Sequence, residues 1–139
     1  MPKLIYFLAC ERVLVNEESP TPSLISIFDR VSAPTPPKDV SNPQAGMPWV
    51  LISNWKKLPE DEGKVYEQRT LLMNPEGISS LETIIQFTIP SPTHRNTVRI
   101  FGFPLTPVGE YHAQLFIRDV GTVDWKQVGE YSIDLNYIE

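Results

Sequence analysis

The chain has 139 residues, of which 41% are hydrophobic and 14 are proline, and its formal net charge is −5 at pH 7. This length fits one domain with its own hydrophobic core, so we treat residues 1–139 as a single domain. The acidic balance argues against a nucleic-acid-binding protein, because such proteins gain affinity from clustered Lys and Arg.

The first predicted element is a strand over residues 4–15, which lack helical periodicity and are rich in aromatic and β-branched types. The apolar run before Cys10 is shorter than the roughly 7–15 residues of a secretory signal core and the roughly 20 that span a bilayer. Cys10 is the only cysteine, so it forms no internal disulfide, and its place in this run indicates an inert core thiol. We therefore expect a cytoplasmic protein that contacts no membrane.

The next stretch is predicted to be a hairpin followed by a long irregular loop. Residues 16–22 have turn composition, and residues 24–28 return as a second strand. A proline-rich loop follows at about residues 32–48. Its prolines favour an ordered surface connection from one sheet to the other. Loops of this length are uncommon inside compact domains, so a functional or mobile element is the alternative.

Residues 49–55 are predicted to form a strand that carries two tryptophans on one face. Trp49 is expected in the core, where aromatic side chains contribute the most buried area. Trp55 allows two interpretations. It is either a core residue or a stacking platform for a sugar or a peptide, beside Lys56 and Lys57 at the end of the strand.

The turn at residues 58–64 contains three consecutive carboxylates, at positions 60–62. Calcium prefers such oxygen ligands, but a loop that wraps a cation usually spaces its ligands at alternate positions. A solvated hairpin tip is therefore favoured over a calcium site. Further strands are predicted at residues 65–73, 81–89 and 98–101, separated by turns at residues 74–77 and 90–96.

The stretch at residues 103–118 carries the clearest fold signal. Pro104 and Pro107 withhold backbone donors and predict a loop that crosses from one sheet to another. From Gly109 onward, apolar and polar residues alternate and predict a strand with Tyr111 first on its buried face. A tyrosine at this point indicates a tyrosine corner, in which the hydroxyl caps the backbone of the preceding loop. A hairpin loop and a last strand from Trp125 onward follow.

These segments amount to about eight or nine strands, with turn signals about every 8–12 residues and no amphipathic helix. The sequence therefore predicts an all-β fold, an antiparallel β-sandwich of the immunoglobulin-like or C2-like kind. A partly closed β-barrel is the alternative.

Catalytic and metal-binding motifs give no prediction of a reaction. The chain has two histidines, His94 and His112, and neither lies near a Gly-x-Ser-x-Gly elbow. One cysteine and two distant histidines do not provide the local spacing of a zinc site, and P-loop and dinucleotide fingerprints are absent. We therefore expect no cofactor and no enzyme. A hydrolase with dispersed carboxylates stays a distant alternative, because such pairs meet from distant strands.

Several short motifs resemble a family of small uncharacterised bacterial proteins that carries only a domain-of-unknown-function label. The motifs are LACERV at residues 8–13, SLISIFDRV at 23–31, MPWV at 47–50, FP at 103–104 and GEY at 109–111. The resemblance implies a stand-alone cytoplasmic β-sandwich with no assigned activity and no catalytic residues. Within it, Asp29 and Arg30 follow an apolar strand, where they form either a fixed salt bridge or cap, or part of a binding surface.

Two functional hypotheses follow from the sequence. The first is a non-enzymatic interaction or structural module that presents loops or a sheet edge to another protein, or to a second copy of itself. The second is a small-ligand module, most plausibly for carbohydrate, with exposed aromatic side chains. Its predicted binding surface consists of Trp55, Lys56, Lys57 and Trp125.

Overall fold

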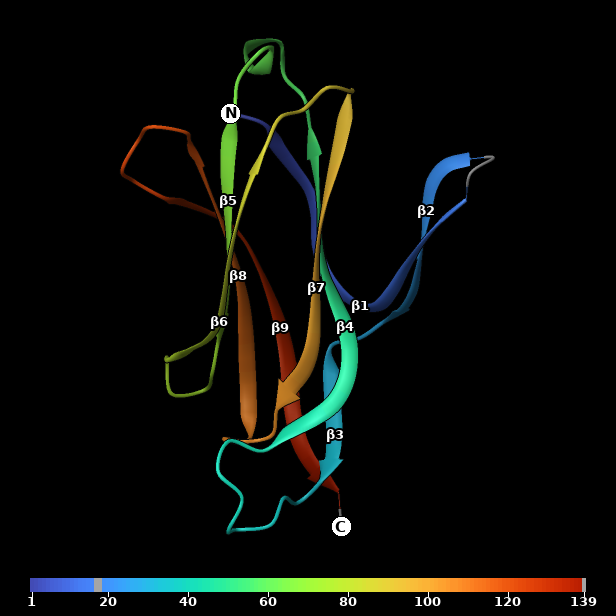
Figure 1. Ribbon diagram of the computed structural model, residues 1–139, viewed down its shortest axis with the longest axis vertical. Helices are drawn as coiled ribbons and strands as arrows, with labels where there is room; N and C mark the ends of the chain where they lie inside the picture. The colour runs from blue at the N-terminus through green and yellow to red at the C-terminus, as the bar shows by residue number, and fades with distance from the viewer. Residues whose placement is uncertain (17–18, 139) are drawn as a thin grey trace.

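Nine strands and one 3-10 helix make up the described part of the chain, residues 1–16 and 19–138, in a computed structural model (Figure 1). In chain order these are β1 (Lys3–Asn16), β2 (Ser19–Ile27), β3 (Arg30–Pro34), β4 (Gln44–Lys56), η1 (Pro59–Asp61), β5 (Tyr66–Met73), β6 (Ser79–Phe87), β7 (Thr93–Pro104), β8 (Gly109–Asp119) and β9 (Lys126–Ile138). None of the described residues belongs to a helix long and apolar enough to cross a membrane.

The strands form two sheets that pack face to face. One sheet has the order β2-β1-β4-β7 and the other β3-β9-β8-β5-β6. Every pairing is antiparallel except that of β3 with β9, which is parallel. The predicted antiparallel β-sandwich is thus confirmed. The β4–β7 pair in one sheet and the β5-β8-β9 trio in the other follow the B–E and C–F–G arrangement of immunoglobulin-like domains.

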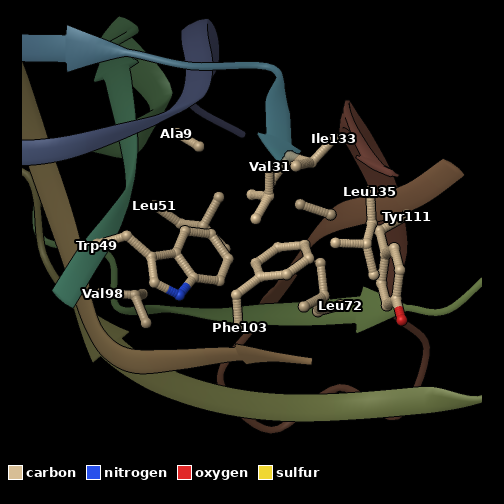
Figure 2. Close-up of a cluster of buried hydrophobic side chains, with 11 residues drawn as sticks. Ala9, Val31, Trp49, Leu51, Leu72, Val98, Phe103, Tyr111, Ile133 and Leu135 are labelled. Atoms are coloured by element: carbon tan, nitrogen blue, oxygen red, sulfur yellow. The ribbon is translucent and has the colours of Figure 1, made fainter. Parts of the chain in front are cut away.

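The main core lies between the sheets and is built around three aromatic rings. The Phe103 ring lies between Trp49 and Tyr111, with ring centroids 5.4 Å and 5.2 Å apart respectively (Figure 2). All three side chains are almost completely buried. Such rings bury more apolar area than any other side chain, so this cluster fixes the spacing of the two sheets. The core position predicted for Trp49 is confirmed.

Tyr111 forms the predicted tyrosine corner. Its hydroxyl donates a 2.7 Å hydrogen bond to the carbonyl oxygen of Pro107, in the loop that connects β7 in one sheet with β8 in the other. Burial is the main cause that raises the pKa of Tyr111 to about 12. The corner ties the crossover loop to the strand that follows it.

Strand β1 changes partners part-way along its length. It pairs with β4 from Lys3 to Cys10 and with β2 from Cys10 to Asn16. Beyond Cys10 the β1–β2 hairpin, residues 11–16 and 19–27, extends away from the rest of the two sheets (Figure 1). We call this hairpin the arm. The arm makes the four-stranded sheet curl. Such curling is the feature expected of a partly closed β-barrel, the alternative fold in the sequence analysis.

A small second core lies at the base of the arm, on the outer face of the four-stranded sheet. Cys10, Val50 and Ile52 are buried there, and Val13 and Leu24 from the arm pack against them. Cys10 is a free thiol, as predicted, and burial raises its pKa. Strand β4 is consequently buried on both faces at this level.

The two predicted loops near the N-terminus are shorter than expected. Asn16 and residues 19–22 belong to β1 and β2, while residues 17 and 18 of the predicted turn lie outside the described residues. The proline-rich loop covers residues 35–43 rather than 32–48. Pro34 ends an edge strand and Pro48 lies at a bulge, two places where a strand tolerates a missing N–H. The loop does connect the two sheets, as predicted.

Two further boundaries differ from the predictions. Strand β7 begins at Thr93, inside the predicted turn at residues 90–96. The chain switches sheets at Phe28 and Asp29, whose carbonyl oxygens accept hydrogen bonds from the Tyr131 hydroxyl (2.6 Å) and the Asp134 amide (2.8 Å). Backbone contacts therefore hold the switch. The salt bridge predicted for Asp29 or Arg30 is not among the ion pairs of the described residues.

Candidate functional site

Trp55 occupies the core rather than the surface. Its side chain is 0% exposed, and its indole Nε1 donates to Gln68 Oε1 at 3.0 Å and to Ser53 Oγ at 3.2 Å. A ring enclosed in this way offers no face to a sugar. Of the two interpretations of Trp55, the stacking platform is wrong and the core residue is right.

Trp55 belongs to a buried polar network that joins the two sheets. Gln68 Oε1 on β5 also accepts hydrogen bonds from Ser53 Oγ on β4 (2.7 Å) and Asn96 Nδ2 on β7 (3.0 Å). At its edge, His94 Nε2 lies 2.9 Å from Asn96 Oδ1. Buried polar groups need such partners, because an unpaired one costs about 1–3 kcal/mol. The network uses its polar groups internally and pins the two sheets together.

The other three predicted surface residues do not form one site. Trp125 is half-buried, and the Arg118 guanidinium lies 4.1 Å from its ring centroid on the outer face of the five-stranded sheet. Lys57 forms an ion pair with Glu62, and Lys56 is exposed at the end of β4. No hydrogen bond or ring contact among the described residues joins Trp125 to Trp55 or the two lysines. The predicted ligand surface is therefore dispersed.

The carboxylates of the turn at residues 58–64 bind protein groups. Asp61 is 1% exposed, and its oxygens accept hydrogen bonds from the Tyr66 hydroxyl (2.6 Å) and the Leu58 amide (2.7 Å). Burial opposes ionisation of this carboxyl, but these bonds and the nearby Met1 ammonium outweigh it and hold the pKa of Asp61 below its ordinary value. The predicted solvated hairpin tip is only part of the description of this turn. Asp61, the central carboxylate, is buried and ties the turn to Tyr66 on β5.

His112 contacts several polar side chains on the outer face of the five-stranded sheet. Its Nδ1 lies 2.9 Å from Glu130 Oε1 and 3.4 Å from Ser132 Oγ, and its Nε2 lies 3.9 Å from Glu110 Oε1. In a serine–histidine–acid relay, serine and acid contact opposite ring nitrogens. Here the nearer acid, Glu130, shares Nδ1 with Ser132, and Glu110 at Nε2 is beyond hydrogen-bond distance, so this group lacks the geometry of that relay. No group of three or more His, Cys, Asp or Glu side chains in residues 1–16 and 19–138 is placed to hold a metal ion.

A hollow in the described surface lies where the arm leaves the sheet. It has a volume of about 590 Å³, and we call it the arm groove. Its walls come from residues 11–13 of β1, residues 46–50 of β4, and Arg99 and Ile100 of β7. The groove exists because β1 turns away from β4 after the Cys10–Val50 pair, so no strand fills the space between them.

The charges in the arm groove are mainly positive. Arg12 and Arg99 line it and are both exposed, and neither guanidinium group forms an ion pair or hydrogen bond within the described part of the chain. Glu11 lines the same groove as the one acidic residue. Free guanidinium groups bind carboxylates and phosphates well, because their planar donors match these anions.

An exposed aromatic ring lies beside the groove. Phe101 on β7 is 75% exposed and pairs across the strands with Pro48 of the groove wall. Strand β7 is also the edge of its sheet, so its outer backbone groups have no neighbouring strand. A large apolar side chain on an uncovered strand edge is typical of a surface where another chain binds.

No protein-family model matches this sequence, and no curated protein sequence matches it. The resemblance to small bacterial proteins therefore stays a prediction.

Sequence reasoning missed the arm groove for a physical reason. Arg12, Pro48 and Arg99 come from three strands, and only the point where β1 separates from β4 brings them to one hollow. One signal was available: Phe101 is apolar at a position that the alternation of Val98 and Ile100 assigns to the opposite face.

Proposed function

We propose that this chain is a non-enzymatic protein-interaction module that binds a segment of another polypeptide along the arm groove. The observation that carries the proposal is the 75% exposure of Phe101 on an edge strand next to that groove. Exposed aromatic side chains beside a concave surface are the residues that dominate binding energy in protein interfaces.

The volume of the groove supports the same proposal. About 590 Å³ is within the range of sites that hold a small ligand or a few side chains of a peptide. The groove lies between the unpaired edges of β1 and β4, which suit an extended chain. Recognition of this kind adds a strand to an exposed sheet edge and reads the side chains at alternate positions.

Selection of peptides from a displayed random library on the immobilised protein tests this function. Peptides captured by the wild type should bind the Phe101→Ser variant at least about tenfold more weakly, because the ring is the apolar anchor. Ile84→Ser is the matched control: Ile84 is 49% exposed on β6, the edge strand of the other sheet. Equal binding by wild type and Phe101→Ser, or a failure to select any peptide, would contradict the proposal.

We further infer that the protein acts in the cytoplasm. The support is chemical: its one cysteine is buried and free, so the fold uses no disulfide and suits a reducing compartment. Fractionation of the source cells under reducing conditions tests this location.

A further inference from the structure

The walls of the arm groove are two strand edges. Strand β1 pairs with β4 only as far as the Cys10–Val50 pair, and from residue 12 onward it pairs with β2 alone. Residues 11–13 and residues 46–49 therefore face each other across the groove, with no strand between them. Edges of this kind bind an extended chain through backbone hydrogen bonds. The shape of the groove thus favours an extended peptide over a folded surface.

The charge of the molecule is divided between its two outer faces. On the four-stranded sheet, alternation along β4 and β7 places Lys56, Arg95 and Arg99 on the outer face, on the same side as the groove. On the outer face of the five-stranded sheet, Glu67 and Glu82 pair with Arg118 and Arg69, and Glu110, Glu130 and Asp134 add three further carboxylates. A chain of net charge −5 thus presents a locally positive face around the groove.

Apolar side chains accompany the cations. Val13 and Val50 line the groove together with Arg12 and Arg99, and Phe101 lies opposite Pro48 of the groove wall. A ligand that matches this surface combines carboxylates with an apolar side chain. A nucleic acid matches it less well, because Glu11 lies in the groove and the chain as a whole is acidic.

We propose that the arm groove binds an extended acidic peptide segment of a partner protein. The peptide carboxylates pair with Arg12 and Arg99, and an aromatic or branched aliphatic side chain packs against Phe101 and Val13. This inference rests on the proposed interaction function and names the chemistry of its partner.

The test compares the composition of selected peptides with the effect of reversing the groove charges. Peptides selected on the wild type should be enriched in Asp and Glu around an aromatic or aliphatic residue. The Arg12→Glu/Arg99→Glu double variant should bind a selected acidic peptide at least about tenfold more weakly. A peptide with Lys in place of its acids should bind that double variant better than it binds the wild type. Both arginines are exposed, so their replacement should leave the fold intact. The single variant Arg99→Gln, which removes one charge without reversing it, should weaken binding by a smaller factor.

The matched control is Lys64→Glu/Lys126→Glu, which changes the net charge equally at exposed positions outside the groove. It should leave affinity within about twofold of the wild type, because distant surface charges are screened by salt. An equal loss in this control would overturn the inference.

The remaining outcomes distinguish the failure of the acidic-peptide inference from the failure of the proposed interaction function. Selected peptides without excess acid that still depend on Phe101 would overturn the acidic class and leave the interaction function standing. Peptides that do not depend on Phe101 would overturn both. Stronger binding of a single-stranded oligonucleotide or of phosphatidylserine vesicles than of any peptide would overturn the peptide class. Analytical ultracentrifugation could also show a dimer of this chain that dissociates when the selected peptide is added. That result would identify a second copy of the chain as the natural occupant of the groove and would overturn the proposal of a peptide from a partner protein.

Discussion

The Tyr66 hydroxyl donates a 2.6 Å hydrogen bond to Oδ1 of Asp61, a carboxylate that is 1% exposed at the turn between β4 and β5. The same carboxylate accepts the Leu58 amide, so one buried anion closes the turn and ties it to β5. Charge-assisted bonds of this kind are about twice as strong as neutral ones. Asp61 also raises the pKa of Tyr66, together with the larger effect of burial.

Replacement of Asp61 by Asn should lower the free energy of unfolding at pH 7 by about 1–3 kcal/mol, because the charge-assisted bonds are lost. The folded-state pKa of Asp61 is lowered, so its contribution is present above the unfolded value of about 3.9 and disappears as pH falls through the folded value. Urea unfolding at pH 7 and at pH 3 measures both effects. The difference in the free energy of unfolding between the wild type and Asp61→Asn should be smaller at pH 3 than at pH 7. An equal difference at both pH values would contradict the role of the Asp61 carboxylate. Glu60→Gln, in the same turn but exposed, is the control.

The tyrosine corner should contribute to stability through one hydroxyl. Tyr111→Phe keeps the ring and removes the bond to the Pro107 carbonyl, and we expect a loss of about 1–2 kcal/mol in chemical denaturation. The raised pKa gives a second readout. Stability from a neutral Tyr111 is complete below pH 10 and is lost as pH rises toward 12. The wild type should therefore lose more stability than Tyr111→Phe over that interval, and an identical loss in both proteins would refute the role of the hydroxyl.

The buried network around Gln68 should be sensitive to loss of its central acceptor. Gln68→Leu leaves the donors of Ser53, Trp55 and Asn96 without their shared oxygen, and we expect a destabilisation of about 3 kcal/mol. Gln86→Leu, on the exposed face of β6, should change stability by less than about 0.5 kcal/mol. Thermal and urea denaturation compare the two variants. A neutral or stabilising Gln68→Leu would show that the network does not hold the sheets together.

The proline-rich connection should be separable from binding. Residues 35–43 do not line the arm groove, whose β4 wall begins at Gly46. Replacement of residues 37–41 by a short Gly-Ser linker should leave peptide affinity within about twofold of the wild type, because loop length changes closure entropy only slowly. Loss of peptide binding in this variant, with an intact circular dichroism spectrum, would instead place function in the loop.

Local patterns predicted the regular parts of this fold well. The alternation at residues 81–89 and 111–117 predicted β6 and β8, and the tyrosine that follows the proline crossover predicted the corner. The short strand β3 was missed because Pro34 and the two prolines that follow it resemble a loop, whereas its backbone pairs with a strand about a hundred residues away in the sequence. The residues of a short segment alone do not indicate which distant strand the segment pairs with.

The candidate site was beyond the reach of local patterns for the same reason. Asp61 resembles its solvated neighbours in sequence, and only the Tyr66 hydroxyl and the Leu58 amide direct it inward. Trp55 lies beside two lysines in sequence, yet its indole N–H binds Gln68 in the core. The arm groove depends on where β1 exchanges β4 for β2 as its partner, and this exchange is a property of the assembled sheet.

The most direct measurement of the central claim is a two-dimensional ¹H–¹⁵N NMR titration of the wild-type protein with a peptide selected on it. Binding in the arm groove should shift the amide signals of Arg12, Val13, Met47, Arg99 and Phe101 and leave those of the outer face of the five-stranded sheet unchanged. Shifts centred on Trp125 and His112, or on residues 35–43, with the groove signals unmoved, would contradict the account.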